Sequence, residues 1–192
     1  IQSQINTLGV TSVASFTVYF RVELIVYLPI VALGQAVVSF IGQNYGAGNY
    51  ERIRKGYRLT LGIAGSIGLF AGIIFYAFNK EIFSLFVEEP EAIAAGGNYL
   101  KILALSQLFM VTESVTAGAF NGTGHTTPPA LTSIFFTGAR IPMAFFLTTF
   151  PALGLTGIWW SITISSVFKG TVLPIWYLWF QRHRLSSIQK QF

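Results

Sequence analysis

The 192-residue sequence contains no cysteine and no aspartate, and only 10% of its residues are charged. The absence of cysteine excludes disulfides, thiolate metal sites and cysteine nucleophiles. An ordinary soluble domain carries roughly a quarter charged residues, which is well above the proportion found here. Hydrophobic residues, by contrast, make up 53% of the chain. These proportions favour a protein that is embedded in a lipid bilayer.

Apolar runs of membrane-spanning length recur along the chain. Residues 59–78 form a stretch of twenty without a formal charge, and an α-helix of about 20 residues crosses a hydrocarbon core of roughly 30 Å. No window favours a strand. The predicted fold class is therefore all-α, a polytopic integral membrane helical bundle. The five predicted spans are residues 13–41, 58–78, 97–120, 129–150 and 154–180.

The connecting segments predict an orientation, because lysine and arginine in short loops are retained on the cytoplasmic side. The basic residues after the first and fifth spans are Arg52, Arg54, Lys55 and Arg58 in the first loop and Arg182, Arg184 and Lys190 in the tail. The other face offers mainly Lys80, with Lys101 near the boundary. We expect a multi-pass protein of the inner (plasma) membrane with the first loop and the tail cytoplasmic. Because membrane orientation explains the basic residues, no nucleic acid partner is expected.

Glu113 is the first candidate for a functional charge, because a charged side chain inside a span is costly and calls for a partner or a role. Ser106, Met110, Glu113 and Ala117 follow a spacing that places them on one helix face. One interpretation is a cavity whose acid binds the coupling cation. The other is a structural acid that pairs with Arg140 in the neighbouring span, and the sequence leaves both open.

Arg21 and Glu23 lie near the outer boundary of the first span. Being two residues apart, they cannot share a helix face, so each should have a different partner. Contact with a gate or with another lobe is one interpretation, and interfacial anchoring is the other. Lys169 in the last span is expected to reach toward the cytoplasmic headgroups. His125 stands alone without ligand spacing, so no metal site is predicted.

Three prolines, at Pro29, Pro142 and Pro174, lie inside predicted spans. Each removes a backbone hydrogen bond and favours a bend. In the second span, Ala64, Gly68 and Gly72 recur every four residues, a stripe that allows another helix to approach closely.

Residues 8–56 resemble the multidrug and toxic compound extrusion (MATE) family. Bacterial members carry an Arg-x-Glu, a helix proline and a Gly-Gln-Asn-x-Gly-Ala turn in this order, which here are Arg21, Glu23, Pro29 and residues 42–47. Residues 85–102, 118–129 and 139–147 match in register as well. The resemblance covers about residues 5–180. Branches with a cation-binding acid in the tenth helix hold it at the position of Met110, so Glu113 lies about one turn closer to the cytoplasm.

The resemblance implies two six-helix lobes with a cavity that opens alternately to each side. This chain would supply helices eight to twelve of the second lobe and would lack the N-terminal lobe and the preceding helix. The expected segments are an outer loop remnant (1–12), the C-terminal lobe (13–180) and a cytoplasmic basic tail (181–192). The implied partners are a small organic substrate and the lipid bilayer.

The implied function is secondary active export of organic, often cationic, drugs or toxic compounds. It would be coupled to H⁺ or Na⁺, with no other cofactor and no enzymatic step. One alternative is a flippase of the same superfamily for lipid-linked oligosaccharide or polysaccharide, which needs a more basic cavity and is kept open by Arg140 and Lys169. A polytopic membrane enzyme is a further alternative, although no aspartate or paired acidic loop cluster supports it.

Overall fold

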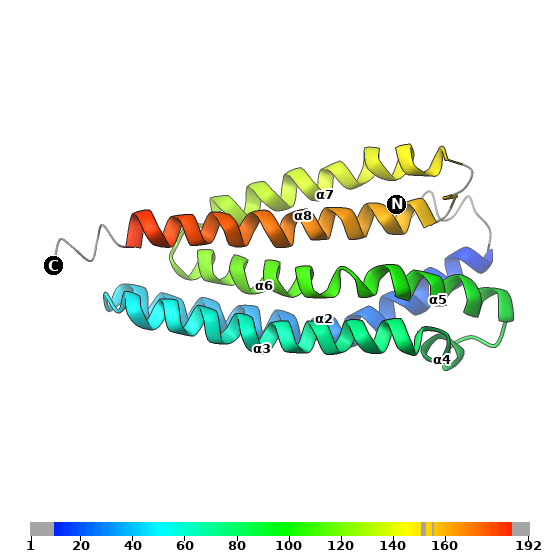
Figure 1. The fold of residues 1–192 in the computed structure, drawn as a ribbon, viewed down its shortest axis with the longest axis horizontal. Helices are drawn as coiled ribbons and strands as arrows, with labels where there is room; N and C mark the ends of the chain where they lie inside the picture. The colour runs from blue at the N-terminus through cyan, green and yellow to red at the C-terminus, as the bar shows by residue number, and fades with distance from the viewer. Residues whose placement is uncertain (1–9, 151–152, 155, 186–192) are drawn as a thin grey trace.

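The computed structural model describes residues 10–150, 153–154 and 156–185, with side chains from Phe20 to His183 within those ranges. The described residues form helices and connecting turns and contain no strand, which confirms the predicted all-α bundle. The long helices run side by side along one axis (Figure 1). The elements are α2 (Val10–Gly46), α3 (Tyr50–Ala77), α4 (Asn79–Ser84), α5 (Pro90–Ala104), α6 (Gln107–Gly122), α7 (Thr127–Thr148), α8 (Thr156–Phe180) and the π-helical turn η1 (Gln181–Leu185).

Most of the predicted spans correspond to helices that can cross a bilayer. The stretch Phe20–Gly46 of α2, together with α3 and α7, is long and apolar enough to do so, and α5 with α6 qualifies as one bent span. The 25 residues of α8 are long enough, but α8 is not among the helices apolar enough for this test. Its polar residues include Ser161, Ser165 and Lys169, which are buried in the bundle rather than turned outward. The fifth span therefore stays a prediction.

The expected continuous span at residues 97–120 is wrong in two respects. The helix starts earlier, with Pro90 in its first turn, and breaks between α5 and α6 with a bend of 51°. Ser106 at the break donates its hydroxyl to the Leu103 carbonyl oxygen at 2.9 Å, a local bond that competes with helix geometry. Gly72 lies on the neighbouring helix α3. If it carried a Cβ atom, that atom would lie only 2.9 Å from the Ala104 carbonyl oxygen, so α3 packs directly against the end of α5.

The prolines do not interrupt their helices. Pro29, Pro142 and Pro174 lie inside α2, α7 and α8, and each helix continues through its proline. The 51° bend lies instead at a break that contains no proline. A proline-dependent bend during function is therefore still only a prediction.

The small-residue stripe of α3 packs as predicted. Ala64, Gly68 and Gly72 are all buried. A Cβ on Gly68 would lie 2.7 Å from Val111 Cγ2, so α3 and α6 approach closely along this stripe. Many large apolar side chains also point outward, as expected for helices surrounded by lipid. Examples of these exposed residues are Leu59, Phe70, Ile134, Phe135, Phe146 and Ile175.

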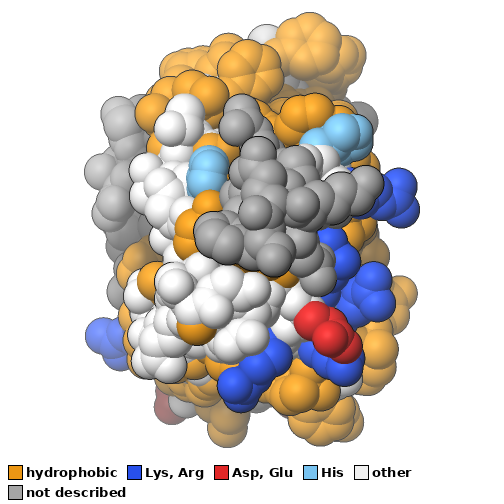
Figure 2. Space-filling model, turned by 90° about the vertical axis from the view of Figure 1, so that its left-hand side faces the viewer, with side chains coloured by type: hydrophobic (Ala, Val, Ile, Leu, Met, Phe, Trp, Pro, Cys, Tyr) orange, Lys and Arg blue, Asp and Glu red, His pale blue; other side chains and the backbone are white. Residues whose placement is uncertain are grey.

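One end of the bundle carries a group of basic residues. The α2–α3 turn and η1 lie at the same end in Figure 1, and Tyr50, Ile53 and Phe180 belong to one buried cluster there. Lysine and arginine side chains gather on that end face in Figure 2. The structure differs from the predicted first loop, because Arg52, Arg54, Lys55 and Arg58 belong to the first turns of α3 and only residues 47–49 separate the helices.

Candidate functional site: a charged cavity between α2, α6, α7 and α8

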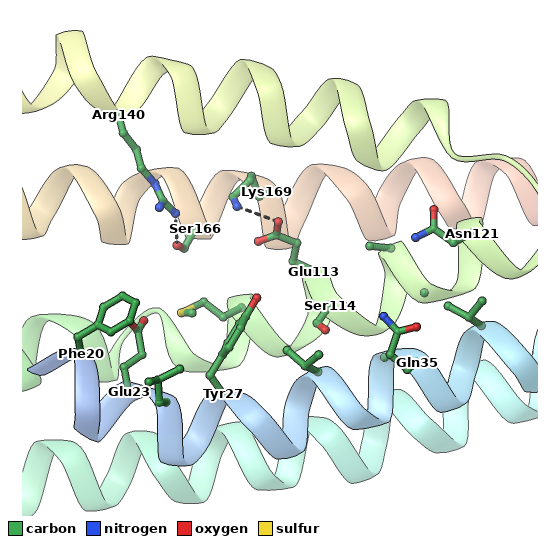
Figure 3. Close-up of a pocket in the computed structure, with 17 residues that line it drawn as sticks. Phe20, Glu23, Tyr27, Gln35, Glu113, Ser114, Asn121, Arg140, Ser166 and Lys169 are labelled. Carbon is green, nitrogen blue, oxygen red and sulfur yellow. Dashed lines mark hydrogen bonds and ion pairs between the residues drawn. The ribbon is translucent and has the colours of Figure 1, made fainter. Parts of the chain in front are cut away.

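A cavity of about 500 Å³ lies between α2 and the helices α6, α7 and α8. Its α2 wall comes from one helix face, because the lining positions recur three or four residues apart. Glu113 lies on the α6 wall, Arg140 comes from α7 and Lys169 from α8 (Figure 3). The lining residues are Phe20, Glu23, Leu24, Tyr27, Val31, Gly34, Gln35 and Val38 of α2; Met110, Glu113, Ser114, Ala117, Gly118 and Asn121 of α6; Arg140 of α7; and Ser166 and Lys169 of α8.

Glu113 forms an ion pair with Lys169. The distance from Lys169 Nζ to Glu113 Oε1 is 2.8 Å, and only 11% and 19% of the lysine and glutamate side chains are exposed. The expectation that Lys169 reaches toward the headgroups is thereby wrong. The observed ion-pair partner of Glu113 is Lys169, whereas the structural alternative had named Arg140. The depth of Glu113 along its helix, which the sequence gives, could not reveal this partner. The choice of partner also depends on which neighbouring helix faces α6.

Arg140 instead bonds to two hydroxyl groups of α8. Its Nε donates to Ser165 Oγ, and its Nη2 donates to Ser166 Oγ at 3.1 Å. The planar guanidinium carries several donors in a fixed fork, which suits two adjacent acceptors. Sequence reasoning missed both serines. The available signal was the run of hydroxyl residues in α8, which is unusual in a lipid-facing helix.

The structure separates the other predicted site residues. Met110 and Glu23 line the cavity, whereas Ser106 and Arg21 are not among the lining residues. Ser106 is fully buried at the α5–α6 break. Arg21 is exposed and Glu23 is half-buried. Contact of these residues with a gate or with another lobe stays a prediction.

The cavity also contains polar groups that sequence reasoning did not identify: Tyr27, Gln35, Ser114 and Asn121. Tyr27 and Gln35 follow Glu23 at multiples of four residues along α2, and this spacing could have indicated that they share its helix face. Its charged residues are two carboxylates and two cations, so the lining is formally neutral. Within the described part of the chain, no group of three or more histidine, aspartate, glutamate or cysteine residues could hold a metal ion. His125 lies elsewhere, with Nδ1 3.0 Å from the Thr123 carbonyl oxygen.

A helical bundle with apolar outer faces and charged groups gathered in one internal cavity has the architecture of a membrane transporter. Comparison with known sequences identifies the family. The MatE family model matches residues 2–146, which is most of this chain. The chain therefore belongs to the MatE family, and the resemblance drawn from its motifs is confirmed.

Individual relatives agree with this assignment. The chain is 30% identical over 175 residues to the "Probable multidrug resistance protein NorM" of Thermotoga maritima, covering 88% of this chain and 37% of the relative. It is 32% identical over 179 residues to the "Probable multidrug resistance protein YpnP" of Bacillus subtilis, covering 92% and 40%. A crystal structure of "MATE in the straight conformation" superposes with a TM-score of 0.85 at 25% identity, covering 98% of this chain and 42% of that one.

The chain thus spans about two fifths of the length of the relatives it matches. The names of these relatives describe resistance proteins and a transporter family, and none of them names an enzyme.

Proposed function

We propose that this chain forms helices eight to twelve in the second lobe of a secondary active transporter that exports organic, often cationic, compounds across the inner membrane by alternating access. Coupling would come from entry of H⁺ or Na⁺. The names of the relatives, which are multidrug resistance proteins, support this class of substrate. For such an exchange to do work, the cation and the substrate must each bind the inward-open and outward-open states differently.

The observation that carries the proposal is the position of Glu113. Its carboxylate is mostly shielded from solvent, lies within a bundle of membrane-spanning helices and still faces a cavity large enough for a small organic molecule. Charged side chains at such depth typically mark ion or substrate pathways. A carboxylate that faces the cavity can attract either the coupling cation or a cationic substrate, and this competition is what an antiporter requires.

A second lobe implies a first lobe elsewhere in the intact protein. The exposed α2 wall of the cavity supports the presence of that first lobe. Phe20, Leu24 and Tyr27 line the cavity, although they remain 52%, 40% and 43% exposed. Another lobe that packs across this wall would enclose the cavity. The length of the relatives leaves room for such a lobe. We further propose that the α2–α3 turn and η1 face the cytoplasm, because the basic residues gather at that end.

The test is efflux of a cationic dye by the intact protein that contains this lobe. We expect Glu113→Gln to abolish most of the efflux at normal expression, because the amide removes the charge while keeping nearly the same shape. Glu88→Gln is the matched control, since Glu88 is exposed in the connection between α4 and α5 and should leave efflux unchanged. Undiminished efflux by the Glu113 variant would remove this carboxylate from the mechanism.

A second candidate function is flipping of a lipid-linked oligosaccharide or polysaccharide. The specific observation in its favour is that Arg140 and Lys169 both line the cavity, where cations could attract a phosphate group. Competition distinguishes the two candidates. If lipid-linked sugar displaces a bound cationic dye from the purified intact protein while other cationic compounds do not, the flippase is favoured.

A further inference from the structure

The ion pair between Glu113 and Lys169 is fixed by close packing of the two helices that carry it. Gly170, the residue after Lys169, lies so close to α6 that a Cβ there would overlap the backbone of Phe109. At the same level, Thr112 Oγ1 donates a hydrogen bond to the Gly170 carbonyl oxygen at 3.1 Å. These contacts hold α8 against α6 immediately beside the pair. This packing therefore brings the helix that carries Lys169 close to Glu113.

Lys169 is paired with Glu113, and two further charged groups, Arg140 and Glu23, line the same cavity. Arg140 from α7 directs its guanidinium to Ser165 and Ser166. Glu23 from α2 is the second carboxylate of the lining. Figure 3 shows the Lys169 ammonium directed at Glu113 from α8, while Arg140 reaches down from α7 to Ser166.

We propose that the Lys169 ammonium is a built-in counter-ion that excludes sodium from Glu113. This inference rests on the proposed function and specifies how the cavity treats one of the two candidate coupling ions. A small hard cation such as sodium is held by several oxygen ligands. Here the best available oxygen ligand already accepts a hydrogen bond from an ammonium group held 2.8 Å away. A sodium ion would have to displace that group and then lie beside its positive charge.

Sodium binding to the purified intact protein tests the proposal without any transport assay. With radioactive sodium at neutral pH, we expect the wild type and Glu113→Gln to bind equally weakly. Lys169→Met should bind sodium saturably and at least about tenfold more tightly than the wild type, because removing one partner leaves an uncompensated buried carboxylate. The double variant Glu113→Gln/Lys169→Met should return to the wild-type level. Lys80→Met is the matched control, since Lys80 is exposed and belongs to α4.

Two results would overturn the counter-ion role. The first is tight sodium binding by the wild type that Glu113→Gln removes, a comparison that needs no variant of Lys169. The second is weak sodium binding by a folded Lys169→Gln protein. This variant replaces Lys169→Met if the methionine variant does not fold, because its amide can still donate a hydrogen bond to Glu113. Dye efflux is measured separately. Its absence from the wild type would contradict the proposed function, whereas the sodium comparison would still decide the role of Lys169.

Discussion

Gly118 of α6 packs against Gly34 of α2 with no room for a side chain between the backbones. A Cβ on Gly118 would overlap the Gly34 carbonyl oxygen, and a Cβ on Gly34 would lie 2.9 Å from Ser114 Oγ. Gly34, Ser114 and Gly118 all line the cavity. This contact therefore sets the separation between two walls of the proposed binding site.

Gly118→Ala should destabilise the intact protein by about 1–3 kcal/mol, the usual range for overpacking a tight contact. Neither helix backbone can move aside as a flexible side chain would, so the apparent melting temperature should fall. Size-exclusion chromatography after heating measures this change. Gly138→Ala in α7 is the matched control because no heavy atom lies within 4 Å of a Cβ built there. Equal melting temperatures for the two variants would contradict the close contact.

A buried hydrogen bond between Tyr57 and Thr116 should stabilise the packing of α3 on α6. Their hydroxyl oxygens are 2.9 Å apart. Tyr57→Phe and Thr116→Val should show a coupling energy of about 0.6 kcal/mol, typical of polar contacts between membrane helices. A double-mutant cycle in unfolding by a denaturing detergent measures it. Tyr76→Phe provides the control, since Tyr76 lies exposed on the same helix. A coupling energy of zero would show that the bond does not stabilise the fold.

Arg140→Gln should change substrate affinity through charge. Removing one of the two cations leaves the lining with a net negative charge. A cationic substrate should therefore bind at least about tenfold more tightly, because a unit charge about 10 Å away contributes about 1.7 kcal/mol at an effective dielectric constant of about 20. The half-saturating dye concentration for efflux reports this change. Arg182→Gln, at the exposed basic end, should have no effect. Weaker dye binding by Arg140→Gln would contradict the prediction, and loss of binding to a lipid-linked sugar would favour the flippase.

The proposed orientation can be tested by labelling two opposite ends of the bundle. Lys55 is well suited because 78% of its side chain is exposed. In a cysteine-free version of the intact protein, Lys55→Cys should react with a membrane-impermeant maleimide only after the cells are opened. Glu88→Cys, in the connection between α4 and α5, should react in intact cells. The reverse pattern would invert the orientation.

The helices and their order could be predicted because they depend on local properties of the chain. Residues 58–78 form one apolar run, and the structure places α3 over Tyr50–Ala77. The interruption at Ser106 could not be predicted in this way, because it involves a side-chain bond to Leu103 and packing of Gly72 against Ala104. Of the candidate cavity residues, Glu113, Met110 and Arg140 line the cavity, while Ser106, at the α5–α6 break, is not among the lining residues.

The sequence by itself determined that the chain is an all-helical membrane protein of the MatE family, because apolar run length, turn residues and motif spacing are properties of neighbouring positions. Only the tertiary structure decided that Glu113 pairs with Lys169 and that Arg140 bonds to Ser165 and Ser166. The reason is that helix rotation and helix contacts select the partner of a buried charge. Here Gly170 brings α8 against α6, and that contact places an ammonium beside the carboxylate.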